Sequence, residues 1–181
     1  MRTTTLTALV VACLATSNLA GAAERKNLQV LNDVSKQVTT YSWFTIFDDV
    51  SASIDGDVVT LTGKVTMPYK RTDIEKRVAK VEGVREVRNQ IEALPASQFD
   101  DGLRYQVARA IYGHPAFWNY ATRFDPPIHI VVDRGNVTLT GIVDNESDRM
   151  IARSLASHTL AFSVGSELKT LAEAKADLEG I

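Results

Sequence analysis

The sequence predicts an α+β fold of two tandem α-β-β-α-β modules, each a three-stranded sheet covered by helices. One observation is a repeat: Val-Thr-Leu-Thr-Gly-Lys-Val at residues 59–65 returns as Val-Thr-Leu-Thr-Gly-Ile-Val at residues 137–143. Another is the sequence around each copy. A short polar segment typical of a turn precedes it, and polar residues followed by apolar residues at helical spacing come after it. A repeat of this length indicates a duplicated module, and modules of this kind usually bind.

The first module is expected over residues 24–95. Apolar residues spaced three or four apart predict an amphipathic helix over about residues 28–41. Residues 50–54 and 59–65 alternate apolar and polar side chains on either side of an Asp-Gly-Asp turn. This combination predicts a β-hairpin.

A second helix and a third strand complete the first module. Ile74, Val78 and Val81 mark the helix, and Gly83 is expected to end it. Residues 87–91 alternate again and predict a short strand, which is closed by a proline.

The second module is expected over residues 98–172 and repeats this order. A helix around Val107 precedes a hairpin formed by residues 128–132 and 137–143, and Ile151 lies in the next helix.

The C-terminal part is expected to contain a last strand and a helical tail. Residues 164–168 are expected as the last strand, displaced by one residue from the register of the repeat. Residues 173–181 are expected as a helical tail.

The N-terminal residues 1–23 resemble a secretory signal peptide. Arg2 is followed by an apolar run from Leu6 to Ala15 and by small residues at Ala20-Gly21-Ala22. The run is too short to span a bilayer. We expect cleavage near Ala22 or Ala23 and a periplasmic protein.

An alternative processing site surrounds Cys13. Val10-Val11-Ala12-Cys13 resembles a lipobox, which would make the mature protein a lipoprotein anchored through Cys13. Ordinary cleavage is favoured because Cys13 lies early and apolar residues continue beyond it.

Composition narrows the classes of partner. The chain has a formal net charge of −2, which argues against nucleic acid as the main partner. Removal of the signal peptide would remove its single cysteine, and with it any disulfide, thiol nucleophile or thiolate metal site.

The residues that carry a family resemblance follow one another in the first module: an Asp-Gly turn, Val-Thr-Leu-Thr-Gly-Lys-Val, Val81-Glu82-Gly83-Val84 and Val87-Arg88-Asn89-Gln90-Ile91. In this order they resemble a BON domain (bacterial OsmY and nodulation). The second module keeps the hairpin but has Ala161-Phe162 and Val164-Gly165-Ser166 in place of the last two elements.

The resemblance implies a non-enzymatic periplasmic or envelope protein associated with phospholipid surfaces, envelope integrity or osmotic stress. It implies no catalytic residues and no cofactor. The Thr-Leu-Thr-Gly elements are interpreted as structural, because their alternation packs Val59 and Leu61 against the helices while Gly63 and Gly141 permit a close approach.

The first candidate binding region lies in the second module and is rich in aromatic residues. On the expected helix, Tyr105, Arg109 and Tyr112 fall opposite the apolar face. Aromatic rings beside arginines suit the headgroup layer of a membrane. The alternative is that the rings pack against the following loop or the other module. The candidate binding residues here are Tyr105, Arg109, Tyr112, Phe117, Trp118 and Tyr120.

The second candidate region is the basic stretch from Lys64 to Arg88, which carries eight basic residues against four acidic ones. Basic residues near an anionic surface each contribute on the order of 1 kcal/mol. The alternative is a solvated helix face with paired charges. The candidate residues are Lys70, Arg71, Arg77 and Lys80.

No metal site and no enzyme are expected. His114, His129 and His158 lie in different elements without ligand spacing. No Ser-His-Asp order, phosphate loop or nucleophile elbow is present in the sequence.

Two hypotheses from different classes remain. The first is peripheral association with anionic phospholipid; the second is a protein-interaction or holdase-like module that uses the same aromatic face on an envelope protein. The oligomeric state is left open.

Overall fold

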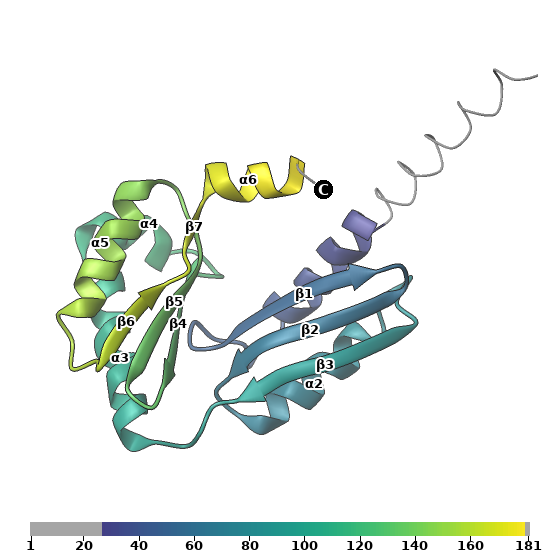
Figure 1. Cartoon of the computed structure of the whole chain (residues 1–181), viewed down its shortest axis with the longest axis horizontal. Coiled ribbons are helices and arrows are strands. Elements are labelled where there is room, and N and C mark those ends of the chain that lie inside the picture. The colour runs from purple at the N-terminus through teal and green to yellow at the C-terminus, as the bar shows by residue number, and fades with distance from the viewer. Residues whose placement is uncertain (1–26, 180–181) are drawn as a thin grey trace, which may run out of the picture.

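The computed structural model describes residues 27–179 and confirms the α+β class, with two sheets that are each flanked by helices (Figure 1). The expected signal peptide over residues 1–23, its cleavage near Ala22 and the alternative site at Cys13 lie outside the described residues.

The first module has the expected order. Its N-terminal helix is described over residues 27–39. The three-stranded sheet has the order β1 (Asp49–Asp55), β2 (Val58–Val65), β3 (Glu86–Ala93), and α2 (Pro68–Val78) connects the last two strands. β1 pairs with β2 antiparallel and β2 pairs with β3 parallel.

The boundaries of α2 differ from the prediction. Pro68 stands in the first turn of α2, where its missing N–H costs no hydrogen bond. The helix ends at Val78 rather than at Gly83, because the next amides bond three residues back: Lys80 N to the carbonyl of Arg77 and Val81 N to that of Val78. Val81 and Gly83 therefore lie in a turn.

The second module repeats this plan and adds short elements. α3 (Gln98–Tyr112) leads through η1 (Pro115–Phe117) and α4 (Trp118–Ala121) to the hairpin of β4 (Ile128–Asp133) and β5 (Asn136–Val143). Sequence periodicity did not identify η1 and α4, which are each less than two helical turns long.

The expected last strand is split, so the second sheet has four strands rather than three. After α5 (Glu146–Ser157), β6 (Ser163–Ser166) and β7 (Lys169–Thr170) pair with successive parts of β5, and α6 (Leu171–Glu179) extends from β7 (Figure 1). The side chain of Leu168 is buried between the two strands.

The repeated hairpin is structural, as predicted. Val59 and Leu61, like their counterparts in β5, are fully buried. Gly63 has φ +119°, and a Cβ placed there would lie 2.2 Å from the carbonyl oxygen of Asp49. Gly141 has φ +111°, and its Cβ would lie 1.9 Å from the oxygen of Pro127. Both positions require glycine.

The two modules are joined by the segment that leads into β1. Ile46 and Phe47 pack against the hydrophobic core of the second module. The amide of Ile130, on the outer edge of β4, donates to the carbonyl of Ile46 at 2.7 Å. Residues of the first module thus complete the second.

Candidate binding surface

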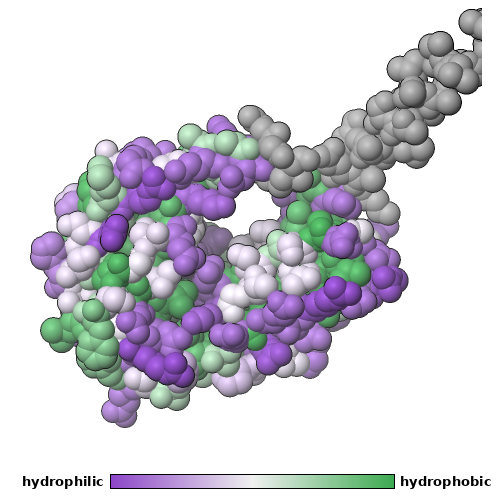
Figure 2. All heavy atoms as spheres, viewed as in Figure 1, coloured by the Kyte–Doolittle hydropathy of each residue, from purple (hydrophilic) through white to green (hydrophobic). Residues whose placement is uncertain are grey.

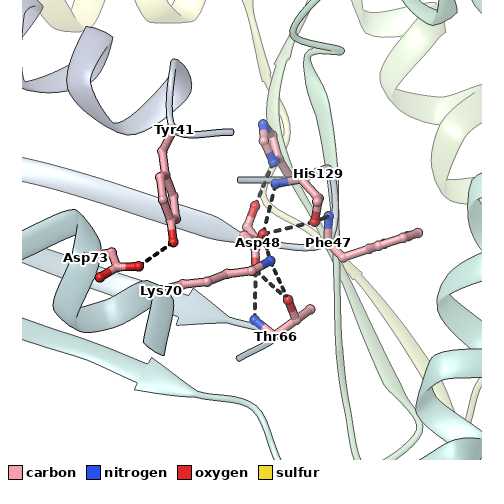
Figure 3. Close-up of polar contacts among 8 residues, drawn as sticks. Tyr41, Phe47, Asp48, Thr66, Lys70, Asp73 and His129 are labelled. Carbon is pink, nitrogen blue, oxygen red and sulfur yellow. Dashed lines mark hydrogen bonds and ion pairs between the residues drawn. The ribbon is translucent and has the colours of Figure 1, made fainter. Parts of the chain in front are cut away.

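Asp48 is the centre of a buried polar network in the first module (Figure 3). One carboxylate oxygen accepts from the amide and the hydroxyl of Thr66 at 2.7 and 2.8 Å. The other lies 2.7 Å from Nζ of Lys70 and also accepts from the amide and hydroxyl of Thr45. A buried carboxylate with this many donors is held in place.

Lys70 was predicted to bind lipid or a partner, and that prediction is wrong because its ammonium is buried against Asp48. Reaching a headgroup would leave a buried carboxylate without its counter-charge. A signal was present in the sequence: Lys70, Ile74 and Val78 recur every four residues, which places Lys70 on the apolar face of α2.

Arg77 also has a structural role, because its guanidinium bonds the N-terminal helix. It donates to the carbonyl of Gln37 at 2.9 Å and to Oγ1 of Thr40 at 3.2 Å, at the C-terminal end of the N-terminal helix. Its guanidinium lies 5.7 Å from the ring centroid of Tyr41. A cation suits this end of a helix because unpaired carbonyls gather there.

Three basic residues of α2 and the turn after it remain exposed. Arg71, Lys76 and Lys80 form no ion pair with the carboxylates of residues 27–179. Three further basic residues of the stretch, in contrast, pair with acids: Lys64 with Asp133, Arg85 with Asp57 and Arg88 with Glu86. The basic surface is therefore smaller than predicted.

Phe117 and Tyr120 belong to the core of the second module, so their prediction as binding residues is wrong. Their rings lie 5.6 Å apart. The hydroxyl of Tyr120 accepts from the amide of Asp144 and donates to the carboxylate of Asp148. Burial raises the pKa of Tyr120 above its ordinary range.

Tyr112 is a structural residue as well, contrary to the prediction. Its hydroxyl donates to the carbonyl of Ile128 at 2.6 Å and accepts from the amide of Ile128 at 3.1 Å. The ring packs against the core, and burial raises the pKa of Tyr112. One hydroxyl thereby satisfies both outward backbone groups of the first residue of β4.

Tyr105, Arg109 and Trp118 are the predicted aromatic and basic residues that remain exposed. Tyr105 and Arg109 lie one turn apart on α3, and Trp118 begins α4. Tyr105 is 66% exposed although its edge contacts Phe47 across the module junction, and Trp118 is 62% exposed. We refer to these three exposed side chains together as the aromatic surface of the second module.

The aromatic surface and the basic residues of α2 belong to different modules. α2 packs on β2 and β3, whereas α3 and α4 pack within the second module. In each module, three side chains of the candidate region remain exposed.

Sequence reasoning did not single out Trp43 and left Phe124 off the list of candidate residues. Both are strongly exposed. Phe124 lines a groove of about 530 Å³ together with residues 39–42 and 44–46 of the first module. No periodicity could have identified it, because the groove forms only where the two modules meet.

The junction also contains polar contacts. Nδ1 of His129 donates to the carbonyl oxygen of Asp48 at 2.7 Å, since a carbonyl can only accept (Figure 3). Nζ of Lys64 lies 2.8 Å from the carboxylate of Asp133, and this hydrogen bond lowers the pKa of Asp133. The space-filling view shows a hollow between the two modules (Figure 2). A cleft of about 350 Å³ is lined by residues of both modules, among them Asp49, Lys64 and Asp133.

Among residues 27–179, no group of three or more histidine or acidic side chains is placed to hold a metal ion. Within the same range, no helix combines the length and the apolar character needed to cross a membrane.

Comparison with known proteins identifies one family. The family model "BON domain" matches residues 33–95 and 121–161, which together make up more than half of the chain. Comparison with curated proteins gives no significant match.

Two solved structures are similar over most of the chain at low identity. CdsD, a structural protein of the type III secretion system of Chlamydia trachomatis, is 14% identical, with 83% of this chain and 97% of that chain covered and a TM-score of 0.29. The C-terminal domain of CdsD is 10% identical, with 77% and 96% covered and a TM-score of 0.27.

Proposed function

Because this chain belongs to the BON-domain family, we propose that it works by binding, as a periplasmic protein that associates with anionic phospholipid surfaces of the cell envelope. Family membership indicates a non-enzymatic envelope protein. The lipid surface, a role in envelope integrity or osmotic stress, and processing by a signal peptidase belong to the proposal.

The observation that carries the proposal is the exposed aromatic surface of the second module. Trp118 begins a short helix with most of its ring in solvent, and Arg109 and Tyr105 lie exposed on the preceding helix. Indole and phenol rings favour the headgroup layer, where the apolar ring and the polar atom each find a suitable environment. Arginine beside them can hydrogen-bond lipid phosphate through two N–H groups.

The exposed basic residues of α2 and of the turn after it support the same proposal through long-range electrostatic attraction. Arg71, Lys76 and Lys80 have no acidic partner among the described residues. Each would be attracted to an anionic surface within a Debye length of about 10 Å at 0.1 M salt. They would raise the rate of encounter, and the aromatic surface would provide apolar contact.

Liposome co-sedimentation tests the proposal. The protein is mixed with phosphatidylcholine vesicles that contain increasing fractions of phosphatidylglycerol, at low and high salt. We expect binding that rises with the anionic fraction and falls with salt. The variant Trp118→Ala with Arg109→Ala should bind at least about tenfold more weakly, as expected when a few aromatic and arginine anchors dominate an interface.

The control is Asp33→Ala with Lys36→Ala, a pair of exposed residues on the N-terminal helix that should leave binding unchanged. Binding to vesicles that ignores both the anionic fraction and salt would contradict the anionic specificity of the proposal. Absence of vesicle binding at every anionic fraction would contradict the proposal and favour the protein-interaction alternative. Unchanged binding by the Trp118 and Arg109 variant would instead assign the contact to α2.

A further inference from the structure

The two modules differ where the hairpin turn meets the loop that leads into β3 or β6. In the first module the amide of Arg85 donates to the carbonyl of Asp57 at 2.8 Å, and in the second the amide of Phe162 donates to the carbonyl of Gly135 at 2.8 Å. The strand registers agree, because β3 and β6 each begin one residue later, opposite the first residue of β2 and of β5. Phe162 therefore stands where the first module has Arg85.

In the first module this position is charged. Arg85 and Asp57 form an exposed ion pair, with Nε of the guanidinium 2.6 Å from the carboxylate. The same backbone hydrogen bond thus closes this loop beside a solvated pair of charges. An aromatic ring at this position is not needed to close the loop.

In the second module the position carries an exposed aromatic ring that is held in place. Phe162 is 76% exposed, and its ring lies on the turn, since a Cβ placed on Gly135 would approach the ring to 2.5 Å. Phe99, in the first turn of α3, stacks on this ring with centroids 5.5 Å apart. Among residues 27–179, this is the only ring contact in which both rings are exposed.

Leu160, in the same loop as Phe162, extends the exposed apolar surface and is 67% exposed. We refer to Phe99, Arg134, Leu160 and Phe162 together as the tip of the second module. The loop from α5 to β6 lies at the outer edge of this module, away from the first module (Figure 1), and hydrophobic residues gather at this edge (Figure 2). Neither cleft of the module junction is lined by residues of the tip.

The charge without a partner at the tip is positive. Arg134, next to Gly135 in the turn, is exposed and forms no ion pair with the carboxylates of residues 27–179. The acids of the neighbouring segments have partners within the protein: Asp100 accepts from the amides of the turn, Asp101 pairs with Arg104, and Asp133 pairs with Lys64. The tip therefore combines exposed apolar side chains with an unpaired guanidinium.

We propose that the tip inserts into an anionic bilayer surface, an inference that deepens the function proposed above and rests on it. Phe162 and Leu160 would enter the interfacial layer between the headgroups, and the guanidinium of Arg134 would bind lipid phosphate. The occupant follows from shape and charge. A fluid bilayer can close around side chains at the edge of a module, and anionic headgroups complement the unpaired arginine.

The tip is separate from the aromatic surface. Phe99 lies in the first turn of α3 and Trp118 follows its last turn, so the two sites lie about 20 Å apart along a helix of 15 residues. A bilayer that touches both sites would run along α3. Because the two sites share no residue, substitutions can test them independently.

Fluorescence quenching tests insertion of the tip. The protein is mixed with phosphatidylcholine vesicles that contain phosphatidylglycerol with brominated acyl chains, which quench tryptophan. We expect Phe162→Trp to raise the quenched fraction of the emission above that of the parent. Met150→Trp, at an exposed apolar position of α5, is the matched control and should not raise it. No added quenching with Phe162→Trp, or equal added quenching with both variants, would overturn the proposal.

Co-sedimentation with the same vesicles measures the affinity. Phe162→Ser with Leu160→Ser should weaken binding at least about tenfold, because two apolar side chains lose their burial in lipid. Met150→Ser should leave binding unchanged, and thermal unfolding checks that each variant is folded. Arg134→Gln removes only a charge and should reduce the dependence of binding on the anionic fraction.

The outcomes separate this inference from the proposed function. If the parent binds no vesicles, the proposed function fails and the inference fails with it. If the parent binds vesicles, but the folded variant with Phe162→Ser and Leu160→Ser binds equally well, the inference alone fails. The tip would in that case be left for a protein partner.

Discussion

At the scale of single residues, Tyr112 shows how an aromatic ring on the outer side of a helix can still be structural. Its ring extends along the core to the edge of β4, and its hydroxyl binds both backbone groups of Ile128. Trp118 is of similar character in the sequence but points into solvent.

The two residues are expected to respond differently to substitution. Tyr112→Phe removes only the hydroxyl and leaves two backbone groups of Ile128 without a partner, so we expect a loss of about 1–3 kcal/mol in the free energy of unfolding. Trp118→Ala should change it by no more than about 0.5 kcal/mol, as for an exposed residue without such contacts. Urea unfolding measures both, and equal losses would contradict the assignment of the two residues.

Asp48 and Lys70 illustrate the same point for charged residues. Both side chains are buried, and the carboxylate also fixes Thr66 at the end of β2 and Thr45 before β1. Nearby, Tyr41 donates to Asp73, and burial together with this bond raises the pKa of Tyr41 to about 12 (Figure 3).

At the scale of elements, the hairpin depends on glycine for two separable reasons. Gly63 and Gly56 both have positive φ, of 119° and 63°. A Cβ at Gly63 would also collide with the backbone of Asp49, whereas nothing lies within 4 Å of a Cβ at Gly56.

Alanine substitution should separate these reasons. Gly56→Ala bears only the left-handed backbone cost, about 1–2 kcal/mol for an L-residue. Gly63→Ala bears steric collision as well and should cost at least about 1 kcal/mol more, as φ outside the αL region and overpacking both contribute. Thermal unfolding of the two variants tests this order, and a smaller loss for Gly63→Ala would contradict the close approach of β1 and β2.

At the scale of the whole molecule, the modules are coupled through one segment and a few polar contacts. Ile46 bonds the outer edge of β4, Asp48 accepts from His129, and Lys64 pairs with Asp133. Asp48 connects this junction to α2 through Lys70.

The Lys64–Asp133 pair gives the junction a pH dependence. The hydrogen bond from Lys64 lowers the pKa of Asp133 in the folded state. The pair therefore contributes stability above the unfolded pKa of about 4, and that contribution is lost as the pH falls through the lower folded value. Both side chains are partly exposed, so the contribution is at most about 1 kcal/mol.

Urea unfolding of the parent and of Asp133→Asn, compared from pH 7 down to pH 3, measures this contribution. The difference between them should be constant near neutral pH and shrink in acid. A difference that grows as the pH falls would contradict the direction of the shift. Glu92→Gln, on the exposed part of β3, is the matched control and should show no such difference.

The sequence by itself determined the modules, the hairpins and the principal helices. These depend on local periodicity: alternation places Val59 and Leu61 on one face of a strand, and four-residue spacing places Ile74 and Val78 on one face of a helix. Because the sequence repeats, the elements predicted for the first module could also be predicted for the second. Burial confirmed both patterns because each buries a continuous apolar face.

Tertiary structure alone decided which polar side chain satisfies each buried group. In the first module the amide of Thr66 bonds Asp48, and Lys70 completes the network. At the equivalent place in the second module, the amide of Asp144 bonds the hydroxyl of Tyr120, and Asp148 stands where Lys70 would be.

The same backbone position is thus satisfied by a carboxylate in one module and by a phenol in the other. The partner comes from a segment 18 residues away in the first case and 24 in the second. Periodicity describes only near neighbours along the chain, whereas the packing of distant segments selects these partners. For the same reason the junction of the modules, and the division of aromatic residues between core and surface, could be read only from the folded molecule.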